Sequence, residues 1–148
     1  ISYTVSTRPP SGIRKKGEKI HMKIDNDCIR DILFTIEESS TFEKPFYING
    51  YQNKQLKISK YEPDKVAYHI RYLVMKGLIF TVKPKPILDN YDLTPEGHEF
   101  LSNVREDNNW NKIKGISSSI GFASLKVISA IAEGVATAAI NKQLGFSE

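Results

Sequence analysis

One stretch of the sequence carries side chains that could bind a nucleic acid. Between residues 63 and 76, cationic, aromatic and imidazole side chains recur at helical spacings: Lys65, Tyr68, His69, Tyr72 and Lys76. Such spacing places side chains on one helix face, where lysines can contact phosphates and ring edges can contact bases. A basic turn with Lys83 and Lys85 follows. These seven residues are the predicted DNA-binding site. The alternative is a solvated helix face with a tyrosine half packed against a neighbour.

The sequence offers no recognisable catalytic or cofactor chemistry. His21, His69 and His98 lack a second metal ligand three or four residues away, so no metal site is predicted. The chain has no glycine-rich phosphate loop and no Gly-x-Ser-x-Gly motif, and Cys28 lies among apolar residues without an activating neighbour. We therefore expect no enzyme, no cofactor and no small-molecule substrate.

The candidate residues are expected to lie on one helix that runs from Pro63 to about Lys76. Proline and acidic residues suit its first turn, and Gly77 suits a left-handed cap at its end. Its buried side is predicted to be an apolar stripe that comprises Val66, Ile70, Leu73 and Val74. The other side of the helix would then carry the candidate DNA contacts.

The segments that follow this helix predict a wing. Residues 78–82 favour a strand, the Lys-Pro-Lys-Pro turn prevents regular pairing, and residues 90–93 return as a second strand. Thr94 and Pro95 then open a new helix as N-cap and first helical residue. Helix, strand, basic turn, strand and helix in this order indicate a winged helix.

Residues 22–60 are expected to supply the rest of that domain. Asp25, Asn26 or Asp27 can cap a helix that ends near residues 38–40. Its apolar face is expected to comprise Cys28, Ile29, Ile32, Leu33 and Ile36. Residues 46–48 form a possible edge strand, and residues 56–59 fit either a strand or a very short helix. We favour a helical turn near 54–60, because a winged helix has a helix before its recognition helix.

The basic excess of the chain is concentrated at its start. The formal net charge is +4, but five of the 21 basic and one of the 17 acidic side chains lie in residues 1–21, which leaves 16 of each in residues 22–148. DNA affinity would then require a local cluster of cations. Residues 1–21 are expected to be a disordered basic tail, with Met22 as the native start. The alternative is a basic arm that enters a DNA groove.

A helical extension, residues 106–148, is expected after a winged-helix domain of residues 22–105. A helix at 109–116 would turn Trp110 and Ile113 inward. Residues 117–143 are predicted to form one amphipathic helix. Its apolar stripe is expected to be the interface of a homodimer and comprises Ile120, Val127, Ile128, Ile131 and Val135. The alternatives are packing on the same chain, a membrane surface or another protein.

Two features of the sequence predict where in the cell the protein lies. Lys126, Glu133 and Gly134 interrupt the last apolar segment, which argues against a membrane span. Cys28 is the single cysteine, which excludes an internal disulfide, and no secretory apolar segment appears at the start of the chain. The sequence therefore predicts a cytoplasmic protein.

Three segments in their joint order resemble one protein family. They are residues 22–38 (MKIDNDCIRDILFTIEE), residues 61–79 and residues 93–101 (LTPEGHEFL), and the similarity extends to about residue 145. The chain resembles the family called domain of unknown function 2513. This resemblance implies a winged-helix-like fold and phage or mobile-element ancestry, without an established activity or site.

The sequence thus predicts an α+β protein, a winged helix-turn-helix domain followed by a C-terminal amphipathic helix. Its expected function is DNA-binding transcription regulation as a prophage or mobile-element protein. The alternative is a winged-helix adaptor that binds proteins and has no DNA affinity.

Overall fold

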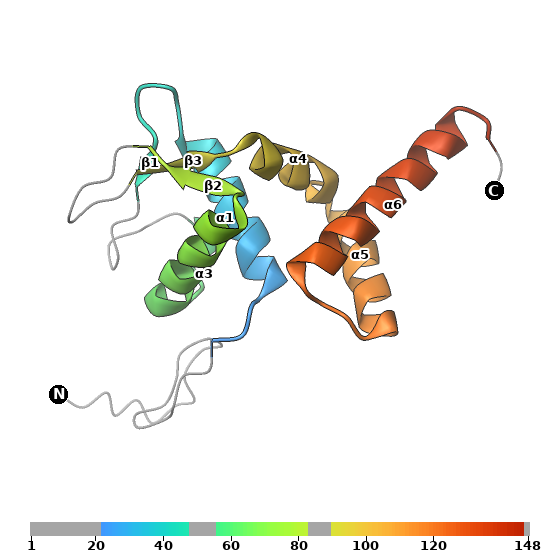
Figure 1. Cartoon of the computed structure of the whole chain (residues 1–148), viewed down its shortest axis with the longest axis horizontal. Coiled ribbons are helices and arrows are strands. Elements are labelled where there is room, and N and C mark those ends of the chain that lie inside the picture. Colours follow the sequence, from blue (N-terminus) through green and yellow to red (C-terminus); the bar gives the residue numbers. More distant parts are fainter. Residues whose placement is uncertain (1–21, 48–55, 83–89, 147–148) are drawn as a thin grey trace. The chain divides into compact units, whose positions relative to one another are not determined.

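The computed structural model describes residues 22–47, 56–82 and 90–146 (Figure 1). It is an α+β protein with a small antiparallel sheet. The chain divides into two compact units, Ile1–Thr94 and Pro95–Glu148. The first unit contains α1 (Asn26–Ser39), β1 (Phe46–Tyr47), α2 (Leu56–Ser59), α3 (Pro63–Lys76), β2 (Ile79–Thr81) and β3 (Asn90–Leu93). The second contains α4 (Pro95–Val104), α5 (Asp107–Ile120) and α6 (Leu125–Gln143).

The three strands pair in the order β1-β3-β2, with both pairs antiparallel. Phe46 of β1 lies opposite Tyr91 of β3, and Ile79 of β2 lies opposite Leu93. The predicted edge strand is therefore confirmed for residues 46 and 47. Across the β2–β3 hairpin, the Val82 amide donates to the Asn90 carbonyl at 2.7 Å.

The first helix follows the sequence pattern. Asp25 is its N-cap, and the five predicted core residues of α1 are all buried: Cys28, Ile29, Ile32, Leu33 and Ile36. This face packs against α2, α3 and β3. The undecided residues 56–59 form the short helix α2, as favoured, and its Ile58 is buried.

Helix α3 begins and ends where the sequence predicts. Pro63 stands at its first turn, and Gly77 caps its end with a φ of 78°. The Thr94 hydroxyl, at the start of the next helix, donates to the Gly77 carbonyl. The predicted core stripe of α3 is wrong at Val74, which is 36 % exposed.

The second unit is built from three helices. Helix α5 packs along α6, and α4 packs on both. The sequence placed residues 95–104 with the winged helix, whereas α4 clusters with the two helices that follow it. Trp110 and Ile113 are buried, as expected, although α5 is longer at both ends than the predicted 109–116.

The predicted single helix over 117–143 is wrong. Helix α5 ends at Ile120, and its C-cap Gly121 has a φ of 81°. Ser124 then caps a new helix by accepting from the Val127 amide. The Ser117 hydroxyl also donates to the Phe122 carbonyl and secures the turn. Local capping therefore overrides the apolar stripe that the sequence predicts through this segment.

The break at Gly121 changes the predicted dimer interface. Ile120 is the last residue of α5 and is 51 % exposed, whereas Ile128 of α6 is only 1 % exposed. Val127, Ile131 and Val135 are half-buried. The five residues therefore do not form one stripe on one helix, and Ile128 belongs to the packed interior.

Candidate nucleic-acid interface

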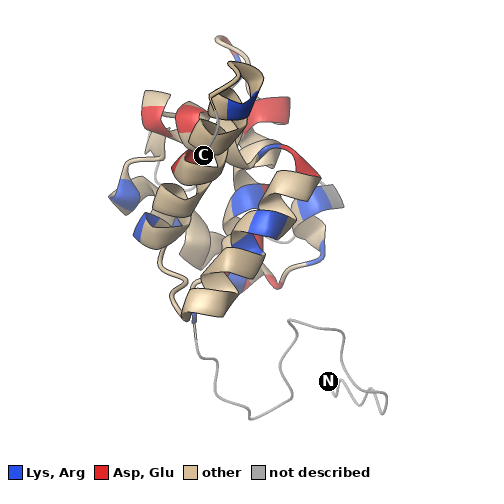
Figure 2. Ribbon diagram, turned by 90° about the vertical axis from the view of Figure 1, so that its right-hand side faces the viewer, with Lys and Arg blue, Asp and Glu red and all other residues tan. Residues whose placement is uncertain are grey.

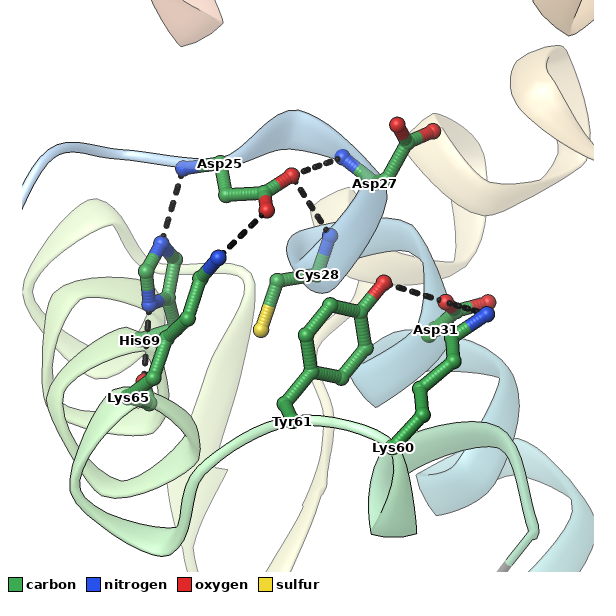
Figure 3. A network of polar contacts seen from close by, with 8 residues as sticks. All are labelled: Asp25, Asp27, Cys28, Asp31, Lys60, Tyr61, Lys65 and His69. Carbon is green, nitrogen blue, oxygen red and sulfur yellow. Dashed lines mark hydrogen bonds and ion pairs between the residues drawn. The ribbon is translucent and has the colours of Figure 1, made fainter. Parts of the chain in front are cut away.

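The buried side of α3 includes a histidine that was expected to face a ligand. Val66, His69, Ile70 and Leu73 are the buried residues of this helix. His69 has no exposed surface, so its prediction as a DNA contact is wrong. A buried polar ring requires hydrogen-bond partners, and both ring nitrogens of His69 have one (Figure 3).

The two partners of His69 define its protonation state. Its Nε2 accepts from the Asp25 backbone amide at 2.8 Å. Its Nδ1 lies 2.8 Å from the Lys65 carbonyl oxygen, to which only a protonated Nδ1 can donate. The ring is therefore neutral, with its proton on Nδ1. Burial lowers the pKa of His69 below its ordinary value, which outweighs the opposite effects of the Lys65 carbonyl and Asp25.

The Asp25 side chain joins the start of α1 to α3. Its Oδ1 accepts from the backbone amides of Asp27 at 2.9 Å and Cys28 at 3.2 Å, and its Oδ2 lies 2.7 Å from Lys65 Nζ. Burial by itself would raise the pKa of Asp25, but Lys65 and the two amides hold it below its usual value. The Lys65 ammonium is therefore engaged within the protein and does not point freely at a ligand.

A second group of polar contacts, centred on Asp31, lies beside the contacts of Asp25. The Tyr61 hydroxyl donates to Asp31 Oδ2 at 2.7 Å, and Lys60 Nζ lies 3.1 Å from the same oxygen. Burial, with the Asp31 hydrogen bond, raises the pKa of Tyr61. Figure 3 shows the Cys28 thiol between the rings of His69 and Tyr61. Burial, followed by the charge of Asp25, raises the pKa of Cys28 to about 12, so the thiol is unreactive at neutral pH.

These contacts give the network in Figure 3 a structural role. They connect α1 to α3 and to the segment before it, and they hold α3 in one orientation on the domain. The described residues hold no group of three or more histidine, cysteine, aspartate or glutamate side chains that could bind a metal ion.

The outer side of α3 carries a different set of residues. Four of its exposed positions form a stripe at spacings of three, four and four: Asp64, Ala67, Arg71 and Met75. Lys76 is also exposed, and Tyr68 and Tyr72 are half-buried at the edges of this stripe. The Arg71 guanidinium lies over the Tyr68 ring, 5.2 Å from its centroid. Lys83 and Lys85 lie outside the described residues.

Arg71 is the functional candidate that sequence reasoning missed. The sequence pattern places Val74 in the core, and this turns the predicted outer face of α3 away from Arg71. His69, at spacings of three and four from Val66 and Leu73, was the signal for the true buried stripe. An imidazole can complete an apolar stripe when the backbone supplies its hydrogen bonds, as happens at His69.

Some of the cations near α3 form ion pairs with acidic side chains, and others do not. Lys57, Lys60 and Lys65 pair with Glu38, Asp31 and Asp25 at 3.0, 3.1 and 2.7 Å. Within the described ranges, Arg71 and Lys76 form no ion pair. Basic and acidic segments are interspersed with uncharged stretches along the ribbon (Figure 2). The available positive charge on α3 is thus confined to its middle and last turns.

Comparison with known proteins places the chain in a family. The family model described as a hypothetical protein, DUF2513, matches residues 23–123. The chain belongs to this family. The match begins just before the Asp25 cap and ends in the turn before α6, so it includes the whole of α1 to α5.

One relative extends the comparison beyond the family model. An uncharacterized protein from Haemophilus influenzae is 29 % identical over 119 residues, which cover 77 % of this chain and 95 % of the relative. No solved structure matches the chain. Among the helices that the structure describes, none has the length and apolar character needed to cross a membrane.

Proposed function

We propose that this chain is a DNA-binding winged-helix protein that regulates transcription, with α3 as its reading helix. The phage or mobile-element origin of this regulator rests on the family resemblance alone. The observation that carries the proposal is the outer face of α3, where Arg71 and Lys76 are exposed without acidic partners in the described ranges.

The order of elements supports a winged helix. A helix, a short edge strand, two helices separated by a tight turn and a β-hairpin follow each other from α1 to β3. The edge strand β1 joins the hairpin, which gives the order β1-β3-β2. A helix-turn-helix with an adjacent hairpin can place its second helix in the major groove and its hairpin turn on the backbone.

The internal contacts of α3 also suit a reading helix. The contacts of Asp25 with His69 and Lys65 hold the inner side of α3, so the outer side can meet a duplex without first becoming ordered. With little net charge in the domain, the affinity would be modest and strongly dependent on salt.

The test is the salt dependence of binding to duplex DNA. Fluorescence anisotropy would follow the full chain and a variant with Arg71→Ala and Lys76→Ala on one labelled duplex, between roughly 50 and 200 mM salt. Loss of the two cations should weaken binding at every salt concentration, and loss of at least one phosphate contact should lower the slope of log K against log salt by about one or more.

The matched control removes two exposed lysines from the second unit. Lys112→Ala with Lys142→Ala changes the net charge equally. It should leave the slope close to that of the unchanged chain. Equal effects of both double variants would indicate non-specific attraction, and no binding at the lowest salt concentration would reject the proposal.

A protein-interaction adaptor is the second candidate, and one observation favours it. Val74, Met75 and Phe80 are exposed by 36, 71 and 44 %, although all three are large and apolar. Exposed apolar side chains at the end of α3 and in β2 could contact another protein. The anisotropy experiment separates the two candidates, because an adaptor without DNA affinity leaves the anisotropy of the labelled duplex unchanged.

The homodimer expected from the sequence remains a prediction with a changed set of candidate residues. Ile128 lies in the interior, so the half-buried Ile131 and Val135 of α6 are better placed to meet a second copy. Dimerisation would provide two reading helices for a two-fold symmetric site. Sedimentation equilibrium should then give twice the chain mass of 16.8 kDa.

A further inference from the structure

We propose that Arg71 is the base-reading residue of α3 and that it selects guanine, with thymine favoured on either side through Ala67 and Met75. This inference rests on the proposed function and names the kind of DNA site that the helix would recognise. It depends on three adjacent exposed positions of α3 and on the chemistry of their side chains.

The first step is the placement of the three residues. Ala67, Arg71 and Met75 succeed each other at intervals of four, on the side opposite the buried Val66, Ile70 and Leu73. Four residues of α-helix advance by about 6 Å, close to two base-pair steps of about 3.4 Å. A helix lying in the major groove could therefore present these side chains to positions within about five base pairs.

The second step is the chemistry of Arg71. Guanine offers two acceptors in the major groove, O6 and N7, and a planar guanidinium can donate to both. The Arg71 guanidinium lies 5.2 Å from the centre of the Tyr68 ring, and it makes no ion pair in the described ranges. Stacking on a ring restricts the arginine before it meets a base, which reduces the entropy lost on binding.

The third step is the contrast with the other cations of α3. Lys65 is bound to Asp25 at 2.7 Å, so it is not available to a base edge. Lys76 is exposed in the last turn and suits a phosphate, because its ammonium is a flexible point charge. Arg71 is therefore the residue of α3 best suited to a two-acceptor contact.

The fourth step concerns Ala67 and Met75, which flank Arg71. Both are exposed, and neither side chain can donate a hydrogen bond. In the major groove such side chains contact the C5-methyl group of thymine. Met75 is 71 % exposed, so this contact would also cover apolar surface that otherwise faces water.

Selection from random duplexes with the full chain tests the inference. The selected sites should contain one constant guanine, with thymine enriched within about five base pairs of it. Replacing that guanine should weaken binding by roughly 5- to 150-fold, the range for a good bidentate contact. Arg71→Ala removes both donors and should lose most of this discrimination, which is measured as the ratio of binding to the two duplexes.

Uracil in place of the flanking thymines removes only the methyl groups. This replacement should weaken binding of the unchanged chain about fourfold for each contacted methyl. It should have a smaller effect at the position read by Met75 when the variant is Met75→Ser, whose side chain is short and polar. Lys112→Ala is the control and should select the same sites as the unchanged chain.

The outcomes separate this inference from the proposed function. If no duplex is bound at low salt, the proposed function itself fails. If duplexes are bound but the selected sites lack a constant guanine, or Arg71→Ala selects the same guanine with equal discrimination, Arg71 is not the reading residue and this inference alone is overturned.

Discussion

His69 is predicted from the sequence to contact DNA, but in the structure it is a buried residue of the core. In the sequence it is one of several polar residues on a helix, and imidazole is a reasonable contact for a base. In the structure it accepts from the Asp25 amide and donates to the Lys65 carbonyl. No sequence pattern reveals the first of these bonds, because its partner lies 44 positions away and its donor is a backbone group.

The protonation state of His69 predicts how stability depends on pH. Its folded pKa is below the ordinary value of 6.5, so the unfolded chain takes up the proton first on acidification. The stabilisation is complete above about pH 6.5 and is lost as the pH falls toward the folded pKa, by up to about 1.4 kcal/mol per pH unit. Urea unfolding of the unchanged chain at pH 7.5 and 5.5 should show this loss.

Substitution isolates the contribution of His69. His69→Gln should be less stable at pH 7.5 but should show a smaller difference between the two pH values. His98→Gln changes an exposed histidine and should behave like the unchanged chain. Asp25 contributes nothing in this window, because its pKa lies below 3.8. An unchanged pH dependence in His69→Gln would contradict the proposed neutral state.

The ends of the helices follow from capping residues that lie close by in the sequence. The Asp25 cap, Pro63 and Gly77 set the ends of α1 and α3 within a residue or two of the prediction. The break between α5 and α6 also had local signals, Gly121 and Ser124, but a near-heptad stripe was read across them. Packing decides which apolar residues share a face, and the sequence does not contain that information directly.

Two glycines offer a matched test of the helix boundaries. Gly77 has a φ of +78° and no atom within 4 Å of an added Cβ, so Gly77→Ala meets backbone strain alone. It should destabilise the protein by roughly 1–2 kcal/mol. Gly115 lies inside α5 with equal space, and Gly115→Ala should stabilise it by roughly 0.5–1 kcal/mol. Thermal unfolding measures both, and effects of the same sign would contradict the assigned boundaries.

Two isoleucines of α6 test the packing of that helix. Ile128 is 1 % exposed, and Ile128→Ala should lower the free energy of unfolding by roughly 2–5 kcal/mol through lost burial and a cavity. Ile140 is 56 % exposed, and Ile140→Ala should change it by less than about 0.5 kcal/mol. Urea unfolding compares them directly. Similar losses in both variants would mean that Ile140 is covered in solution.

At the scale of the whole molecule, the sequence predicted the α+β class and most of the first unit. It predicted Lys76, Tyr68 and Tyr72 on the outer face of α3, where Lys76 is exposed and the two tyrosines are half-buried at the edges. It missed Arg71 and misplaced His69. The difference arises because side-chain partners such as Asp25 for Lys65 come from a distant segment. DNA binding by this outer face is proposed, and experiment can compare it with the surface of the second unit.

Site-directed crosslinking reports which surface of the protein lies against the duplex. The single cysteine, Cys28, is buried and has a pKa of about 12, so an added exposed cysteine can be labelled selectively with a photoreactive group. The label would be attached to Ala67→Cys, to Met75→Cys and, as a control in the second unit, to Ala138→Cys. The proposed interface predicts crosslinks to duplex DNA from positions 67 and 75 and none from 138. Crosslinks from position 138 alone, or equally from all three, would contradict it.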